Sequence, residues 1–72
     1  MSKGTQFLSD TNTQREAEQY LESLISSDKA IVALQEEGNT GKIAETYSAR
    51  SITFIHLHNK TKDKMYLVLA RS

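Results

Sequence analysis

The sequence has no cysteine, no proline and no apolar run long enough to cross a membrane. Without cysteine the chain can form neither a disulfide nor a thiolate metal site, and it fits a reducing compartment. A membrane-spanning helix needs about 20 consecutive apolar residues, which excludes an integral membrane protein. Without proline, turns must be located from glycine, asparagine and clusters of polar residues. We therefore expect one soluble, cytoplasmic domain that covers residues 1–72.

The N-terminal segment is mostly polar. Met1–Asp10 contains one lysine and no apolar core of signal-peptide length, which agrees with a cytoplasmic protein. Phe7 and Leu8 are its two large apolar residues besides the initiator methionine. We expect residues 1–11 to form a flexible tail.

The charges balance over the chain but not along it. Nine basic and nine acidic residues give a formal net charge of zero. Residues 1–40 carry three basic and seven acidic side chains, whereas residues 41–72 carry six basic and two acidic ones. The chain thus has an acidic half and a basic half, and the basic half could attract phosphate groups or an acidic partner.

An amphipathic helix is predicted over about Thr13–Ser26. Thr13 followed by Glu16 fits a capping box, in which two side chains satisfy free N–H groups at a helix start. Five residues at helical spacing form one apolar stripe: Ala17, Tyr20, Leu21, Leu24 and Ile25. We expect this stripe to face either the core or the seam of a dimer.

A β-hairpin is predicted in the middle of the chain. Lys29–Gln35 and Lys42–Ala49 are its strands, and Gly38–Gly41 is its turn, because glycine and asparagine tolerate positive φ. The β-branched pair Ile31 and Val32 favours a strand. The sequence leaves an alternative open for residues 29–37, namely a second helix that is capped at Ser27, ends at Gly38 and turns Ala30, Ile31 and Leu34 inward.

Two further strands are predicted at Ser51–His58 and Lys64–Ala70, joined by the polar loop Asn59–Asp63. Both runs are apolar on both faces of a strand, so each side of the sheet needs a cover. The prediction is an α+β fold in which the helix packs on an antiparallel sheet of about four strands in meander order. Self-association, most simply a two-fold dimer, closes the far face.

The candidate binding residues are the basic residues and histidines of the C-terminal hairpin: Arg50, His56, His58, Lys60, Lys62 and Lys64. On a strand His56 and His58 would share a face and could donate two nitrogens to zinc, but the pattern supplies no third ligand. No spacing assembles a nucleophile with a base. We therefore predict no metal, no cofactor and no catalytic residues.

These features favour a non-enzymatic protein-interaction module that regulates or inhibits a larger protein, of the kind that phages and mobile elements encode. The alternative is a binder of nucleic acid or nucleotide phosphates that uses the basic hairpin. The neutral overall charge of the chain disfavours this alternative, because domains that bind nucleic acid are usually basic.

Overall fold

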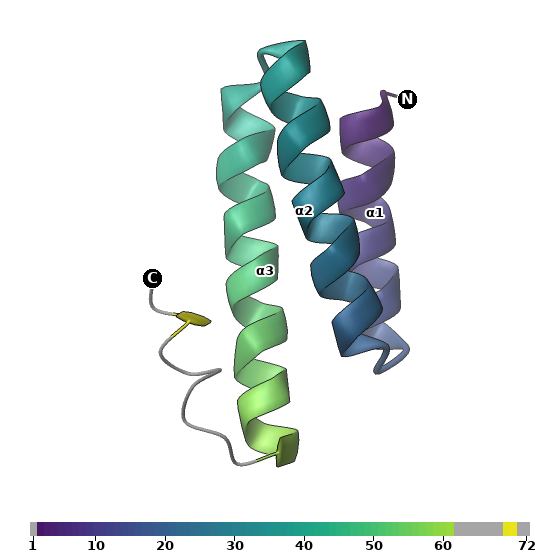
Figure 1. The fold of residues 1–72 in the computed structure, drawn as a ribbon, viewed down its shortest axis with the longest axis vertical. Helices are drawn as coiled ribbons and strands as arrows, with labels where there is room; N and C mark the ends of the chain where they lie inside the picture. Colours follow the sequence, from purple (N-terminus) through teal and green to yellow (C-terminus); the bar gives the residue numbers. More distant parts are fainter. Residues whose placement is uncertain (1, 62–68, 71–72) are drawn as a thin grey trace.

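The chain folds into three helices, as the computed structural model shows for residues 2–61 and 69–70 (Figure 1). Helix α1 covers Lys3–Glu16, α2 covers Tyr20–Glu37 and α3 covers Thr40–Thr61. Short turns join them, so that each helix runs antiparallel to the next. The Cα atoms extend over 36 × 24 × 13 Å, which describes an elongated and rather flat bundle.

The predicted α+β fold with an antiparallel sheet is wrong, because the described residues contain no strand. The first predicted hairpin strand, residues 29–35, lies within α2, so the helical alternative for residues 29–37 is the one found. Residues 42–49 and 51–58 both belong to α3. The last predicted strand, Lys64–Ala70, lies outside the described residues except for residues 69–70, which are helical.

Helical spacing of the buried side chains explains why residues 42–58 form a helix. Thr46, Ala49, Thr53 and Leu57 are all buried and recur every three or four residues, which places them on one face of a helix. Their hydroxyls made half of this stripe look like a polar surface. The apolar residues of the same segment resembled a strand that is apolar on both faces. The periodicity of a short apolar run does not distinguish a helix from such a strand.

The first helix begins at the segment that we expected to be a flexible tail. Ser2 is its N-cap, and the Ser2 hydroxyl accepts the backbone N–H of Thr5 at 3.2 Å. The predicted helix Thr13–Ser26 is divided, because the chain turns between α1 and α2 with Glu18 in the left-handed region at φ 62°. The capping-box residues Thr13 and Glu16 thus end a helix instead of starting one.

The turn predicted from glycine and asparagine is present, but it joins two helices. Gly38 has φ 70° and ends α2, and its N–H donates to the carbonyl of Gln35 at 3.1 Å. This left-handed conformation favours glycine because it has no Cβ. Asn39 then caps α3, since its Oδ1 accepts the backbone N–H of Lys42 at 3.1 Å.

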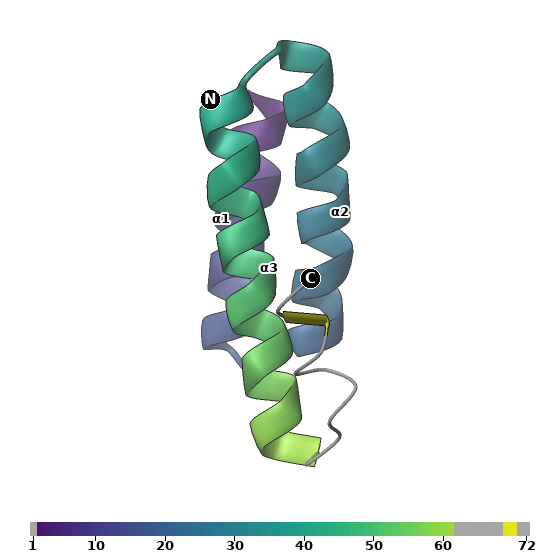
Figure 2. The ribbon, with the colours of Figure 1, turned by 90° about the vertical axis from the view of Figure 1, so that its left-hand side faces the viewer.

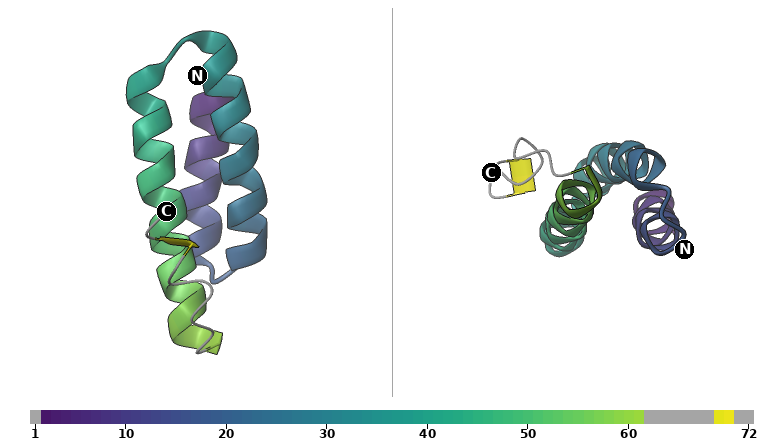
Figure 3. Two further views of the ribbon diagram at one scale, coloured as in Figure 1. Left: turned by 60° about the vertical axis from the view of Figure 1, so that its left-hand side comes forward. Right: turned by 90° about the horizontal axis from the view of Figure 1, so that it is seen from below.

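Helix α2 lies between the other two helices and packs on both (Figures 2 and 3). Seen from below in Figure 3, the helices form an open V with α2 at its apex. A direct link across the opening comes from Arg15 of α1, whose Nη1 donates to the carbonyl of Ala49 in α3 at 3.1 Å. One long side of α2 therefore faces away from both neighbours.

Helices α1 and α2 lie close together at Gly4. A Cβ at this position would lie 2.5 Å from Cδ2 of Leu34, so a larger residue would force α1 away. The backbone N–H of Gly4 also donates to Oε2 of Glu37 at 3.1 Å. Leu34 is fully buried there and forms the main apolar cluster with Leu8, Ala30 and Ala49.

Candidate protein-interaction surface

The interior of the bundle contains as many small hydroxyl side chains as apolar ones. In the part of the chain that the structure describes, six hydrophobic residues are buried, and so are six serines and threonines: Thr11, Ser23, Ser26, Ser27, Thr46 and Thr53. Among the described residues, no buried side-chain nitrogen or oxygen lacks a hydrogen bond. Such hydroxyls allow close helix packing, but each buries less apolar area than leucine or isoleucine would.

A network of these hydroxyls joins all three helices. The Ser23 hydroxyl of α2 donates to the carbonyl of Thr11 in α1 at 2.8 Å and lies 3.1 Å from the hydroxyl of Thr53 in α3. The Thr53 hydroxyl lies within hydrogen-bond distance of two acceptors, the Ser23 hydroxyl and the carbonyl of Ala49 at 3.1 Å, and shares its one proton between them. The side chains that look like a polar surface in the sequence thus hold the bundle together.

Several large apolar side chains are not buried in the interior and lie on the surface of the bundle. Among the residues whose burial the structure describes, seven are exposed: Leu21, Ile25, Val32, Tyr47, Ile52, Ile55 and Leu69. Single exposed apolar residues are ordinary on protein surfaces, but contiguous apolar patches mark interaction sites. The distribution of these seven side chains therefore decides whether the bundle carries such a patch.

Three of them lie in one line along the free side of α2, which the exposed carboxylate of Asp28 interrupts. Leu21 is 60% exposed, and Ile25 and Val32 are each 55% exposed. At 100° per residue they lie within about 40° of one another around the helix axis, and the line is about 16 Å long. We call Leu21, Ile25 and Val32 the α2 seam. It includes Leu21 and Ile25, so the core alternative for the amphipathic stripe is wrong, whereas the dimer-seam alternative stays a prediction.

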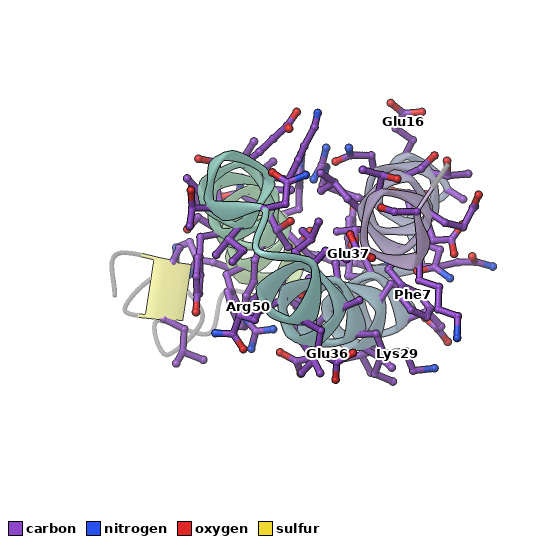
Figure 4. All side chains as sticks on the ribbon, turned by 90° about the horizontal axis from the view of Figure 1, so that it is seen from above. Phe7, Glu16, Lys29, Glu36, Glu37 and Arg50 are labelled. Carbon is purple, nitrogen blue, oxygen red and sulfur yellow. The ribbon has the colours of Figure 1, made fainter. Side chains whose placement is uncertain are left out.

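Charged residues follow the α2 seam along its α1 side. Glu22, Lys29 and Glu36 recur every seven residues, so they form a line parallel to the seam. The Nζ atom of Lys29 lies 5.9 Å above the centre of the Phe7 ring. Seen from above, Phe7, Lys29 and Glu36 lie on the outer side of the α1–α2 pair (Figure 4).

The α3 side of the seam carries an ion pair. Asp28 of α2 accepts a hydrogen bond from Nη1 of Arg50 in α3, and the same atom donates to the Ser27 hydroxyl at 3.0 Å. The guanidinium also lies 5.2 Å from the centre of the Phe54 ring. Arg50 therefore fixes α3 against α2, as its position between the two helices in Figure 4 shows.

An open pocket of about 440 Å³ adjoins the α2 seam at Val32. Its apolar lining comes from Phe7 of α1 together with Val32 and Ala33 of α2, and charged side chains surround it. A second pocket, of about 270 Å³, lies beside α3 and is lined by Tyr47, Arg50, Ser51, Phe54 and Leu69. The larger pocket extends the apolar surface of the seam towards α1.

Two of the three exposed apolar residues of α3, Ile52 and Ile55, lie on the side of the helix opposite its buried face, whereas Tyr47 lines the second pocket. Ile52 is 43% exposed and Ile55 is 42% exposed, and a spacing of three residues puts them on neighbouring positions of one helix face. We call Ile52 and Ile55 the α3 patch. It is smaller than the α2 seam and lies on a different side of the bundle.

The predicted basic site residues that the structure describes do not all share one surface. Arg50 points to α2, whereas His56 stacks on Tyr20 with ring centres 5.7 Å apart. Lys60 lies 5.6 Å above the same tyrosine ring, and His58 is half-buried. Lys62 and Lys64 lie outside the described residues. The hairpin that was to bring these six residues together does not exist; their role in binding stays a prediction.

The helical conformation also separates the two histidines. Residues two apart on a helix differ by about 200° around its axis, so His56 and His58 cannot chelate one ion as they would on a strand. Within residues 2–61 and 69–70, no group of three potential metal ligands lies close enough to hold an ion. No helix in this part of the chain is long and apolar enough to cross a membrane.

The α2 seam could have been found in the sequence. Leu21, Ile25, Asp28 and Val32 are spaced by four, three and four residues, which is the repeat of a coiled-coil seam. The stripe that we assigned to the core or to a dimer seam contains its first half. The repeat crosses from the predicted helix, which ended at Ser26, into the predicted strand, which began at Lys29. It was therefore not recognised as one helical pattern.

Comparison with known proteins adds no assignment. No protein-family model, no curated protein and no solved structure matches the chain. The functional argument therefore rests on the geometry of the bundle.

Proposed function

We propose that the protein is a small, non-enzymatic interaction module that regulates or inhibits a larger protein by direct contact. The observation that carries the proposal is the distribution of side chains between interior and surface. Hydroxyl side chains fill much of the interior, while isoleucine, leucine and valine remain outside on α2 and α3. A cover over the exposed apolar side chains would gain about 25 cal/mol per Å² of apolar surface removed from water.

The polar groups of the bundle also support a contact role. The buried hydroxyls of Ser23 and Thr53 are engaged in linking helices, and Arg50 is engaged with Ser27 and Asp28. The lining of the larger pocket combines apolar side chains with lysines and carboxylates, a composition that suits an apolar side chain of another protein with a polar rim. The proposal includes a cytoplasmic location, for which the lack of cysteine is the support.

Site-specific photocrosslinking in the host cell tests this proposal. A photoreactive phenylalanine analogue replaces Ile25 in the α2 seam, Ile55 in the α3 patch or, as the control, the exposed Ser9 of α1. We expect an adduct with one defined larger protein from an apolar position and none from Ser9. Apolar interface residues are the ones that approach a partner most closely.

The identified protein is then purified and titrated with matched variants. Ile25→Gln and Ile52→Gln make the same chemical change on two different helices, and both side chains are exposed, so neither should unfold the bundle. We expect one of them to weaken binding at least about tenfold, which corresponds to the loss of an interface residue that contributes more than about 1 kcal/mol. If crosslinking from both Ile25 and Ile55 yields only adducts between copies of this chain, the result contradicts the proposal that the protein regulates a larger protein.

A further inference from the structure

The α2 seam fits a second copy of the chain, and we infer that the protein forms a two-fold dimer in which the α2 helices pack antiparallel. This goes beyond the proposed function, because it assigns the seam to self-association and leaves the α3 patch for the larger protein. The inference rests on the heptad spacing of the seam, on its position away from α1 and α3, and on the charges along its edge.

The spacing makes the seam suitable for helix pairing. Leu21, Ile25, Asp28 and Val32 occupy successive positions of a coiled-coil repeat, which keeps one face of α2 towards a partner helix. Both existing neighbours lie on other sides of α2, so a third helix can approach without displacing either one. The exposure of Leu21, Ile25 and Val32 shows that this face is open in the single chain.

One antiparallel register satisfies the apolar residues. When Leu21 faces Val32 of the second copy, two-fold symmetry repeats the same contact at the other end. Ile25 then faces Asp28 of the second copy near the centre. Asp28 keeps its partner Arg50, so its carboxylate stays neutralised at the interface. A single polar position in a seam is a known means of fixing the register.

The same register pairs opposite charges. Glu22 and Lys29 lie on the same edge of α2, seven residues apart. In the dimer, Glu22 of the first copy approaches Lys29 of the second, and Lys29 of the first approaches Glu22 of the second. The symmetry gives two such pairs. On the opposite edge, half-buried Leu24 and Ile31 meet in the same way. The surface is therefore complementary to itself in both apolar contact and charge.

A parallel arrangement lacks this complementarity. In a parallel pair, the edge that carries Glu22 and Lys29 faces the other edge of the second helix. Glu22 and Lys29 would then lie beside Leu24 and Ile31, and the charges would have no partner. The antiparallel register is thus the one that the charges select.

Charge exchange between subunits tests the inference. Glu22→Lys and Lys29→Glu each replace two attractive pairs by two repulsive ones in a homodimer, so each single variant should raise the dimer dissociation constant at least about tenfold. In an equimolar mixture, one variant presents two lysines and the other presents two glutamates. The antiparallel heterodimer regains both attractive pairs, so the mixture should dimerise at least as strongly as the parent.

Sedimentation equilibrium of the full chain at micromolar concentration provides the readout. The inference predicts twice the chain mass of 8.1 kDa for the parent and the mixture, and a shift towards the single mass for each variant alone. Circular dichroism checks that each variant remains helical. Ile25→Gln should also dissociate the dimer, whereas Ile52→Gln should not.

Three results would overturn the inference. They are a monomeric parent, a dimer that Ile25→Gln leaves intact, and a mixture that associates no better than its components. None of these results decides the proposed function, because photocrosslinking of the α3 patch to a larger protein is independent of dimerisation. Conversely, a dimer with the predicted charge exchange but no adduct to a larger protein would reject the proposed function alone.

Discussion

Replacing Leu34 by alanine tests the orientation of α2, which determines both the core and the proposed surface. Leu34 is fully buried, and it contacts α1 where Gly4 allows the two helices to come close. Removing a buried leucine side chain costs about 2–5 kcal/mol, because apolar contacts are lost and a cavity remains. Domains have a free energy of unfolding of about 0.05–0.15 kcal/mol per residue. For a chain of 72 residues, the substitution thus removes a large part of the stability.

The matched control is Leu21→Ala, the same change thirteen positions earlier in the same helix. Leu21 is 60% exposed, and a surface substitution of this kind usually changes the free energy of unfolding by less than about 0.5 kcal/mol. Urea and thermal unfolding followed by circular dichroism, in protein dilute enough to be monomeric, compare the two variants. The melting temperature of Leu34→Ala should fall by at least about 8 °C. A larger loss for Leu21→Ala than for Leu34→Ala would show that α2 faces the other way and would refute the proposed surface.

Three further predictions follow from particular contacts. Gly4→Ala should give a net loss of about 0–2 kcal/mol, because overpacking against Leu34 costs about 1–3 kcal/mol and alanine gains roughly 1 kcal/mol over glycine in a helix; a gain of about 1 kcal/mol in urea would show that α1 and α2 are further apart. Ser23→Ala should cost about 1–3 kcal/mol in the same assay, since the hydroxyl between Thr11 and Thr53 is lost, whereas the exposed control Ser9→Ala should cost less than about 0.5 kcal/mol. Fluorescence anisotropy should detect no submicromolar binding of single-stranded DNA at about 0.15 M salt; tight binding that Lys60→Gln weakens would favour the nucleic-acid alternative.

The sequence predicts local features of this fold better than its class. The turn at Gly38 follows from glycine and asparagine, and the helical alternative for residues 29–37 correctly placed Ala30 and Leu34 inward. These features depend on backbone conformation and on the residues next to it. They do not need knowledge of what packs against the segment.

The first helix escaped prediction because its buried face is unusual. Gly4, Leu8 and Thr11 are the buried residues of α1, and Leu8 is the one large apolar side chain among them. A periodicity of apolar residues therefore hardly exists in this segment. Serine and threonine that hydrogen-bond across helices look the same in a sequence as serine and threonine in a loop.

The amphipathic stripe was recognised, but its direction was left open between the core and a dimer seam. A helical period shows which residues share a face, and it cannot show whether this face meets the core or the surroundings. Ser23, Ser27 and Ala30 occupy the opposite side of α2 and are buried instead. The positions of Leu21 and Ile25 follow from the hydrogen bonds of these small residues, which only the three-dimensional structure reveals.

The most direct test of the account is the solvent accessibility of individual methyl groups in the full chain. A soluble paramagnetic agent is added to dilute, methyl-labelled protein, and the relaxation enhancement of each methyl group is measured by NMR. The account predicts strong enhancement for Leu21, Ile25 and Val32 and weak enhancement for Leu8 and Leu34. Weak enhancement at Ile25 together with strong enhancement at Leu34 would contradict it, because the apolar line of α2 would then be the core and no interaction surface.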